Sequence, residues 1–386
     1  MDKKPERLVP EVRFKGFTDD WEQHKLRKVA CINPKTNIPD NFKYVDLESV
    51  VGTSLIKAKL TTKQLAPSRA QRVAKKGDIF YQTVRPYQKN TFLFDINNYD
   101  FQYVFSTGYA QLRSEINNYF LFSYLQRQRF VNLILRRSTG TSYPAISSKD
   151  LSEIKIIFPR NSKEQENIGK IINLIDALIT LQQRKLEQLK LLKKAILQII
   201  ASNGFLLHTK KVDMIKVRVA DIYQITRGNV LARSEISNVQ TSKYPYPVYS
   251  SQTKNLGLMG YYKDFLFKNA ITWTTDGANA GTVKYRKGRF YSTNVNGVLL
   301  SSEGLANQLT AELLNLVAFK YVSHVGNPKL MNNTMGEIMF NIPESIETQQ
   351  YFSNCIELVI NLIGKQEKAI DKLNKLKKYL LQELFI

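Results

Sequence analysis

Apolar residues recur with helical spacing in two long segments of the chain. From Ser162 to about Ala201, and again from Phe352 to Leu384, they stand at alternating intervals of four and three residues. This spacing is typical of a coiled-coil seam. Each segment predicts a helix of about 37–40 residues, or about 55–60 Å at 1.5 Å per residue. The turn-forming run Ser202-Asn203-Gly204 should end the first helix.

The two predicted helices are copies of each other. A shift of 184 positions aligns residues 141–202 with residues 325–386 without a gap and gives 16 identities in 62 positions. The chain is therefore a tandem repeat of a globular block followed by a long helix. We divide it into a first block (1–159), a first long helix (160–203), a second block (204–343) and a second long helix (344–386).

The polar positions of the predicted seam repeat as well. Gln182 and Gln366 fall at one seam position, and Lys193 and Lys377 fall at another. Antiparallel packing would bring the two glutamines together, where each amide can donate to the other; the alternative is that they lie at the seam edge in water. The predicted seam residues are Ile175, Ile179, Gln182, Leu186, Leu189, Val359, Ile363, Gln366, Ile370 and Leu373.

The two blocks differ from the helices in their pattern. Short β-rich runs, such as residues 76–81 and 270–275, are separated by clusters of Gly, Asn, Pro and Ser. Residues 117–135 and 309–322 read as helices. The predicted fold class is α+β: two mixed α/β blocks separated by two long helices, which form an antiparallel coiled coil with approximate two-fold symmetry.

The charge is strongly basic, with 56 Lys and Arg against 33 Asp and Glu, a net +23. The first block carries 26 basic and 15 acidic groups and the second 16 and 8, so the blocks hold +11 and +8 of the surplus. This distribution favours a nucleic acid, because neutralised phosphates release counterions. The alternatives are a surface tuned for solubility and a basic membrane-surface helix, but the amphipathic segments carry the least net charge.

Two cysteines and the lack of an apolar run of about 18 residues fit a cytoplasmic protein without a membrane span. The three histidines and two cysteines are isolated from one another, and no Gly-rich nucleotide loop occurs. Asn33-Pro34-Lys35 and Asn327-Pro328-Lys329 lack the second proline and the aromatic residue of an adenine-methylating loop. Glu153-Ile154-Lys155 has no suitably spaced upstream carboxylate for a nuclease site. We therefore expect no catalytic residue, no metal site and no cofactor bound by this chain.

Side chains that suit base reading are plentiful in both blocks. Arg suits guanine, Asn and Gln suit adenine, and Ser, Thr and Asp adjust to several partners when they stand on loops. Such a loop can also be an ordinary polar turn, and Arg or Lys can bind phosphates instead of bases. The candidate DNA-binding residues are Arg69, Arg72, Arg85, Tyr87, Lys89, Arg136, Arg137, Ser138, Thr141, Arg227, Ser250, Gln252, Thr253, Thr275, Asp276, Asn279, Thr293, Asn294 and Asn296.

The chain resembles the DNA-specificity subunits of Type I restriction–modification systems over essentially its full length. The segments that carry the resemblance are Ile157-Phe158-Pro159 through Glu164-Gln165, Ile342-Pro343 through Gln349, Tyr246-Pro247-Val248-Tyr249-Ser250-Ser251 and Ile271 through Val283. The family usually has Glu-Gln before each helix, whereas the second copy here reads Thr348-Gln349.

The resemblance implies two target-recognition domains that read the halves of a bipartite, asymmetric DNA sequence, with the helices as a spacer. It further implies double-stranded DNA, two methyltransferase subunits and two restriction subunits as partners. S-adenosylmethionine, ATP and Mg²⁺ are then expected on those partners, and the chain itself is not an enzyme. The alternatives are a stand-alone sequence-specific or architectural DNA-binding protein and, with less support, a nuclease with a cryptic site.

Overall fold

Two long helices run through the computed structural model, which describes residues 8–202, 206–207, 210–251 and 254–386. Helix α4 spans Ser162–Ala201 (40 residues) and α8 spans Ile346–Glu383 (38 residues). Both match the segments predicted from the apolar spacing. None of the described helices is long and apolar enough to cross a membrane.

The chain forms two compact units whose borders cut through both long helices. Unit 1 comprises residues 1–184 and 368–386, and unit 2 comprises residues 185–367. Each unit therefore holds one globular block and a part of each helix, a division that differs from the four consecutive segments drawn from the sequence. Gln182 belongs to unit 1 and Gln366 to unit 2, and their pairing stays a prediction.

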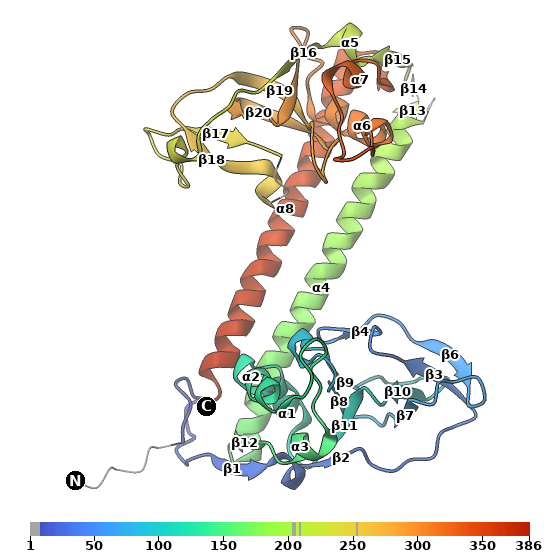
Figure 1. The fold of residues 1–386 in the computed structure, drawn as a ribbon, viewed down its shortest axis with the longest axis vertical. Helices are drawn as coiled ribbons and strands as arrows, with labels where there is room; N and C mark the ends of the chain where they lie inside the picture. The colour runs from blue at the N-terminus through green and yellow to red at the C-terminus, as the bar shows by residue number, and fades with distance from the viewer. Residues whose placement is uncertain (1–7, 203–205, 208–209, 252–253) are drawn as a thin grey trace. The chain divides into compact units, whose positions relative to one another are not determined.

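Within each unit the helices run antiparallel and side by side (Figure 1). In unit 1, Ile168 and Ile172 of α4 share a core with Leu384 and Phe385, while Asp176 pairs with Lys377. In unit 2 the core joins the end of α4 to the start of α8, and the ion pair of Lys190 and Glu367 lies farther along. Of the described seam residues, Ile175, Ile179 and Gln366 are buried, and the others are half-buried.

The described part of unit 1 contains two four-stranded sheets and two strand pairs (Figure 1). The first sheet has the order β2 (Ala30–Ile32), β11 (Tyr109–Ser114), β8 (Ile79–Gln82), β9 (Thr91–Leu93). The second has the order β6 (Lys59–Thr62), β3 (Asn41–Val45), β10 (Tyr103–Ser106), β7 (Ala70–Val73). Strand β1 (Glu22–Lys25) pairs with β12 (Lys155–Phe158), and β4 (Val50–Val51) pairs with β5 (Ser54–Leu55). The helices of this block are α1 (Asn118–Leu125), α2 (Gln128–Arg137) and α3 (Ser148–Ser152), with short 3₁₀ turns at Leu26–Lys28 and Pro86–Gln88.

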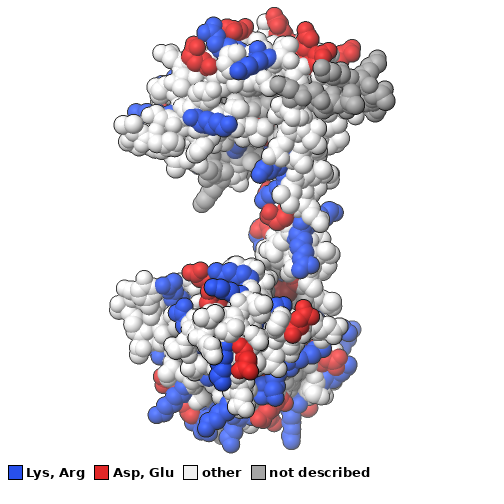
Figure 2. Space-filling model, turned by 90° about the vertical axis from the view of Figure 1, so that its right-hand side faces the viewer, with Lys and Arg blue, Asp and Glu red and all other residues white. Residues whose placement is uncertain are grey.

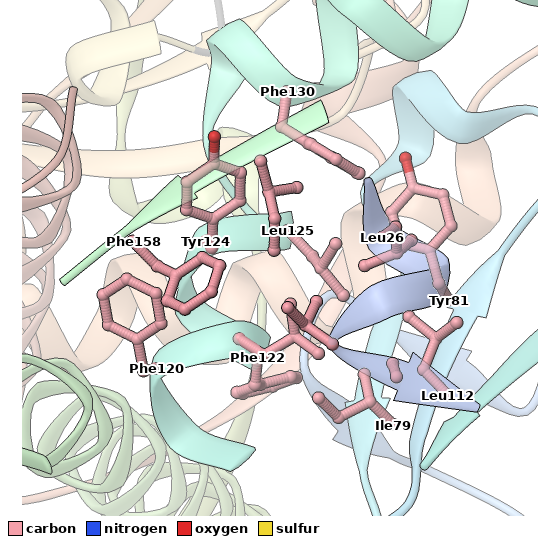
Figure 3. Close-up of a cluster of buried hydrophobic side chains, with 14 of the residues drawn as sticks. Leu26, Ile79, Tyr81, Leu112, Phe120, Phe122, Tyr124, Leu125, Phe130 and Phe158 are labelled. Atoms are coloured by element: carbon pink, nitrogen blue, oxygen red, sulfur yellow. The ribbon is translucent and has the colours of Figure 1, made fainter. Parts of the chain in front are cut away.

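The main core of unit 1 lies between the first sheet, α1, α2 and the long helices. Figure 3 shows Phe122 of α1 beside Ile79 of the sheet, and Phe120 and Tyr124 of the same helix on the side of Phe158. The single helix predicted over 117–135 is two helices, because Arg127 is extended (φ −64°, ψ 140°) where α2 begins. The strand predicted at 76–81 starts only at Ile79, because Gly77 (φ 90°) forms a turn before it.

Unit 2 is built around a six-stranded sheet of order β16 (Gln224–Arg227), β21 (Asn296–Leu300), β19 (Phe267–Thr274), β20 (Val283–Ser292), β17 (Tyr246–Tyr249), β18 (Leu258–Tyr262). Strand β15 (Met214–Arg218) pairs with β22 (Met339–Pro343), and β13 (Leu206–Leu207) with β14 (Lys210–Lys211). Helices α5 (Val219–Ile222), α6 (Gln308–Ala318) and α7 (Asn332–Gly336) accompany them, with 3₁₀ turns at Arg233–Glu235, Lys254–Gly257 and Phe319–Tyr321. Trp273, Leu309 and Leu314 lie in the core of this unit.

A repeated glutamine ties each long helix to its own block. Gln165 donates from Nε2 to the Pro159 carbonyl (2.8 Å) and accepts from the Asn117 N–H (3.0 Å). Gln349 donates in the same way to the Pro343 carbonyl (2.8 Å) and accepts from the Asn307 side chain (3.3 Å). The residue before each glutamine differs. Glu164 is buried and pairs with Arg13, whereas Thr348 is half-buried and uncharged. The second copy therefore lacks this ion pair.

Candidate nucleic-acid interface

The loop that follows β8 in unit 1 is held by main-chain hydrogen bonds. Thr83 donates to the Gly108 carbonyl from both its N–H (3.0 Å) and its Oγ1 (2.9 Å). The Arg85 N–H donates to the Pro144 carbonyl (2.7 Å). Arg85 and Lys89 both have left-handed backbones (φ 55° and 56°), which is uncommon for residues other than glycine. The loop is therefore fixed in an unusual course rather than left free.

Unit 2 has the same loop after β19. Thr275 donates to the Val295 carbonyl from its N–H (3.2 Å) and its Oγ1 (3.0 Å). The Gly277 N–H donates to the Pro328 carbonyl (2.9 Å), and Pro328 is the 184-shifted mate of Pro144. Gly277 therefore stands where Arg85 stands in unit 1. One scaffold presents different side chains in the two units, which is what two readers of unlike sequences need.

The same repeat continues in the strands beside the two loops, in the first sheet of unit 1 and in the six-stranded sheet of unit 2. The Gln82 N–H bonds the Asn90 carbonyl as the Thr274 N–H bonds the Thr282 carbonyl. The bridge of Thr139 to Ala145 recurs at Ser323 and Lys329, again 184 positions on. The two blocks keep this backbone pattern while most of their side chains differ.

The structure brings several predicted residues of unit 1 together. The Arg85 guanidinium lies 4.3 Å from the centre of the Tyr143 ring, so the segment after α2 meets the loop after β8. Tyr87 is exposed on this loop, and burial, followed by the nearby Lys377 and Lys378, lowers the pKa of Lys89. Arg72 lies instead on β7 of the second sheet, and Arg69 directly precedes that strand. Arg69 donates to the Tyr44 hydroxyl (3.2 Å).

Arg136 belongs to a separate basic hollow of unit 1. Together with Arg127, Arg129 and Lys155 it lines a cavity of about 410 Å³. Arg127 is buried, which lowers its pKa, and its Nε and Nη1 have no hydrogen-bond partner. Its Nη2 donates to the Ile386 carbonyl. Of this group only Arg136 was predicted from the sequence, since its members come from the α1–α2 junction, α2 and β12.

In unit 2 the predicted residues divide by burial. Thr275, Thr293 and Asn296 are buried, and they shape the loops from inside. Their contact with DNA stays a prediction, and Asn296 lines the same small cavity as Thr274 and Asn279. Gln252 and Thr253 lie outside the described residues. The remaining candidates of both units are exposed or half-buried: Arg69, Arg72, Arg85, Tyr87, Lys89, Arg136, Arg137, Ser138, Thr141, Arg227, Ser250, Asp276, Asn279 and Asn294.

Two further cations of unit 2 were not predicted as site residues from the sequence. Lys284 and Arg286 lie two residues apart on β20, and both line a small cavity beside Thr274 and Asn279. The sequence signal was the alternation of basic residues in a β-rich run, which places them on one face of a strand.

Basic side chains are not confined to one patch. Figure 2 shows Lys and Arg spread over one face of unit 1 with fewer Asp and Glu among them. The charge therefore supports affinity for a polyanion without marking which loops read it. Within the described part of the chain, no group of three or more His, Cys, Asp or Glu side chains could hold a metal ion.

Comparison with known proteins agrees with the family resemblance of the sequence. The family model described as Type I restriction modification DNA specificity domain matches residues 18–191 and again 211–375. The N-terminal part of a proposed type I specificity subunit of Mycoplasma pneumoniae is 42% identical over 124 residues, which are 31% of this chain and 65% of that protein.

Two solved structures are similar over nearly the whole chain. The crystal structure of a Type I restriction–modification S subunit from M. genitalium has a TM-score of 0.68 at 15% identity and covers 98% of this chain and 99% of that one. A chain from a structural study of complex assembly and conformational transition in a type I system has a TM-score of 0.51 at 19% identity, covering 95% of this chain and 97% of that one. At these identities the likeness concerns the fold.

Proposed function

Since the chain belongs to the family of Type I restriction–modification DNA specificity proteins, we propose that it is the sequence-reading subunit of such a system. Each unit binds one half of a bipartite double-stranded DNA target. The observation that carries the proposal is the pair of equivalent loops, anchored at Thr83 and Thr275 by the same hydrogen bonds. Because Arg85 in one loop corresponds to Gly277 in the other, the two half-sites differ and the target is asymmetric.

The long helices are proposed to set the spacing between the half-sites. A helix advances 1.5 Å per residue, so one heptad is about 10 Å, which corresponds to about three base pairs at 3.4 Å each. A matched change of length in both helices would preserve the seam pattern and alter only the spacing.

The chemistry is assigned to partner subunits. Methyltransferase subunits with S-adenosylmethionine would methylate adenine at N6, and restriction subunits with ATP and Mg²⁺ would cut the DNA. The present chain docks them and supplies no catalytic step. We propose that methylation and cleavage take place in the cytoplasm.

A repeated set of exposed leucines supports two copies of the methyltransferase subunit. Leu174, Leu178 and Leu376 are exposed in unit 1. Their 184-shifted mates in unit 2 are Leu358, Leu362 and Leu192, which are exposed too. Exposed leucines that recur along a helix indicate a protein contact surface. Two equivalent surfaces suit two copies of one partner, and two restriction subunits would join by the same symmetry.

The test is expression of the chain with the methyltransferase subunit of its own system in a host without adenine methylation, followed by methylation-sensitive sequencing. We expect one bipartite, asymmetric motif carrying N6-methyladenine, present only when both proteins are made. Leu178→Lys with Leu362→Lys should abolish methylation and leave DNA binding intact, whereas Gln183→Lys, a change at an exposed polar position of α4, should preserve both. Sequence-specific binding without methylation would instead identify a stand-alone DNA-binding protein.

A further inference from the structure

One face of the unit 2 sheet is polar over part of its area, beside the apolar cluster of Ala270, Phe290 and Val298. Ile271, Trp273 and Val283 point into the core. The alternate positions on β19 and β20 face the other way and carry Thr272, Thr274, Lys284 and Arg286, all of which line one cavity. Two cations thus share a face of a single strand.

Arg286 is held rigidly on this face. Only 7% of the residue is exposed, and its guanidinium lies 3.7 Å from the centre of the Tyr249 ring. Its Nε donates to Thr272 Oγ1 (3.1 Å) and its Nη1 to the Leu256 carbonyl (2.9 Å). Burial is the main reason that the pKa of Arg286 is lowered to about 10. No ion pair involves Arg286 within the described residues, so its charge is buried without a counterion.

Lys284 adds a second positive charge to the same cavity. Burial, followed by the charge of Arg286, lowers the pKa of Lys284 to about 8. Glu312 attracts Lys284 from a distance, but its carboxylate pairs with Lys193 at 2.6 Å. A buried, unpaired charge costs several kcal/mol unless an opposite charge compensates it. The pocket therefore favours an anion.

The fold itself does not require these cations. In unit 1, β8 pairs Phe80 with Phe92 at the positions where β19 pairs Thr272 with Lys284. There the face is an aromatic core, in which Phe80 stacks on Phe105 at 3.6 Å between ring centres. Since the same scaffold is stable with phenylalanines, the cations of unit 2 point to a ligand rather than to folding.

The size of the cavity limits that ligand. It measures about 20 Å³, room for about one water-sized group. A base, a nucleotide or a whole phosphate is too large to be enclosed, whereas one oxygen atom fits with the rest of its group outside. Ser250, Ser251, Thr282 and Asn279 complete the polar lining with hydroxyl and amide donors.

We infer that this pocket receives one anionic oxygen of a DNA backbone phosphate, held between Lys284 and Arg286, and so fixes the position of the duplex against unit 2. The inference rests on the proposed function, because the phosphate belongs to the DNA that unit 2 reads. A neutral base oxygen would leave two positive charges uncompensated, whereas a phosphodiester supplies the missing negative charge. Phosphate contacts position a protein on DNA without reading its sequence.

The experiment compares Lys284→Gln with Lys268→Gln, an equal loss of charge at an exposed residue of β19. Binding of the full chain to its target duplex and to an unrelated duplex is measured over a range of KCl concentrations. We expect Lys284→Gln to weaken both complexes by a similar factor and to reduce the salt slope by about one, with wild-type behaviour restored by Lys284→Arg. Lys268→Gln should change neither.

Other results would overturn the inference. A Lys284→Gln variant whose preference for one base changes would identify a base reader, and a variant that folds and binds as the wild type would remove the pocket from the DNA contact. Stabilisation of the chain by inorganic phosphate that needs Lys284, with DNA binding unaltered, would assign the pocket to a free anion. Failure of the proposed function is distinct, because the wild-type chain itself would then show no preference for a target duplex.

Discussion

Asp176 on α4 and Lys377 on α8 form an ion pair of 2.6 Å inside unit 1, with side chains only 14% and 16% exposed. The same lysine donates to Gln126 Oε1 at the end of α1 (2.6 Å). Burial raises the pKa of Asp176, and the neighbouring Lys377 opposes that shift. Lys193, the repeat mate of Lys377, forms an ion pair with Glu312 of α6. The repeated lysine of the predicted seam thus joins each long helix to the block of the other repeat: Lys377 of α8 to the first block and Lys193 of α4 to the second.

Removing one member of the Asp176–Lys377 ion pair should destabilise unit 1. Lys377→Met leaves the Asp176 carboxylate buried without a partner and should cost about 3–5 kcal/mol of unfolding free energy. The double variant with Asp176→Asn should recover most of that loss, since no buried charge remains. Urea unfolding provides the measurement. Lys375→Met, which breaks the exposed pair with Asp371, should cost less than about 1 kcal/mol; equal losses for both lysines would contradict the argument.

The repeated glutamine anchors make a second prediction. Gln165→Met or Gln349→Met leaves buried main-chain or side-chain groups without hydrogen bonds and should cost about 2–4 kcal/mol. Gln350→Met, next to the second anchor but exposed and bonded only to Asn354 (3.0 Å), serves as the control and should change stability little. Hydrogen exchange should show the loss in unit 1 for Gln165 and in unit 2 for Gln349. A loss of protection spread evenly over both units would speak against local anchoring.

A substitution of Arg85 tests whether the loop after β8 contacts DNA. Because its guanidinium is presented by a fixed loop above Tyr143, Arg85→Ala should cost about 1–3 kcal/mol of binding and relax specificity at one base. If Arg85 binds a phosphate instead, binding should weaken for all sequences and the salt slope should flatten. Selection of bound duplexes from a random pool separates these outcomes, with the exposed Lys149→Ala as control. Neither effect would mean that the loop faces away from DNA.

The spacer role predicts the effect of shortening both helices together. Deletion of residues 181–187 and of their mates 365–371 removes one heptad from each helix. The methylated motif should keep both half-sites and lose about three base pairs between them. Deletion from one helix alone puts the seam out of register and should impair assembly. A motif with altered bases and unaltered spacing would refute the idea.

DNA binding should depend on pH through Lys284. A bound phosphate stabilises the charged lysine, so binding favours protonation and should weaken as pH rises through about 8, the pKa of Lys284 without DNA. Arg286 faces the same cavity, and its pKa is higher, at about 10. The ratio of wild-type to Lys284→Gln affinity should therefore fall between pH 7 and pH 9. A constant ratio would rule out a titrating contact.

Folding stability should respond to the same lysine with the opposite sign. The pKa of Lys284 is lower in the folded chain than in the unfolded chain, so the unfolded state binds more protons between pH 8 and pH 10.5. Without DNA, the stability of the wild type relative to Lys284→Gln should rise across that window. Paired unfolding curves at several pH values measure this difference.

The long helices could be predicted closely because their signal is local. A seam pattern over about ten turns fixes both the helix and its buried face, so α4 begins and ends at the predicted residues Ser162 and Ala201. The break at Arg127 could not be predicted in this way, because both halves of residues 117–135 are apolar and helical in composition.

The candidate site was predicted only in part. The loop compositions led to Arg85 and Asp276, but composition carries no information on burial, and Thr275 is enclosed by the strands beside it. The likeness of the two blocks was hidden because strand registers depend on main-chain hydrogen bonds, which unlike side chains can share. The place of Lys284 and Arg286 could not be predicted from the sequence, because it depends on which face of β20 packs against the core.

The division of the chain into units has a consequence for synthesis on the ribosome. Unit 2 is one continuous stretch, residues 185–367, whereas the core of unit 1 needs Leu384 and Phe385. A nascent chain therefore completes unit 2 before unit 1. The apolar surface around Trp21 and Phe120 stays uncovered until Leu384 and Phe385, which follow α8, have been made. Loss of Leu384 and Phe385 would thus damage the core of unit 1 and spare that of unit 2.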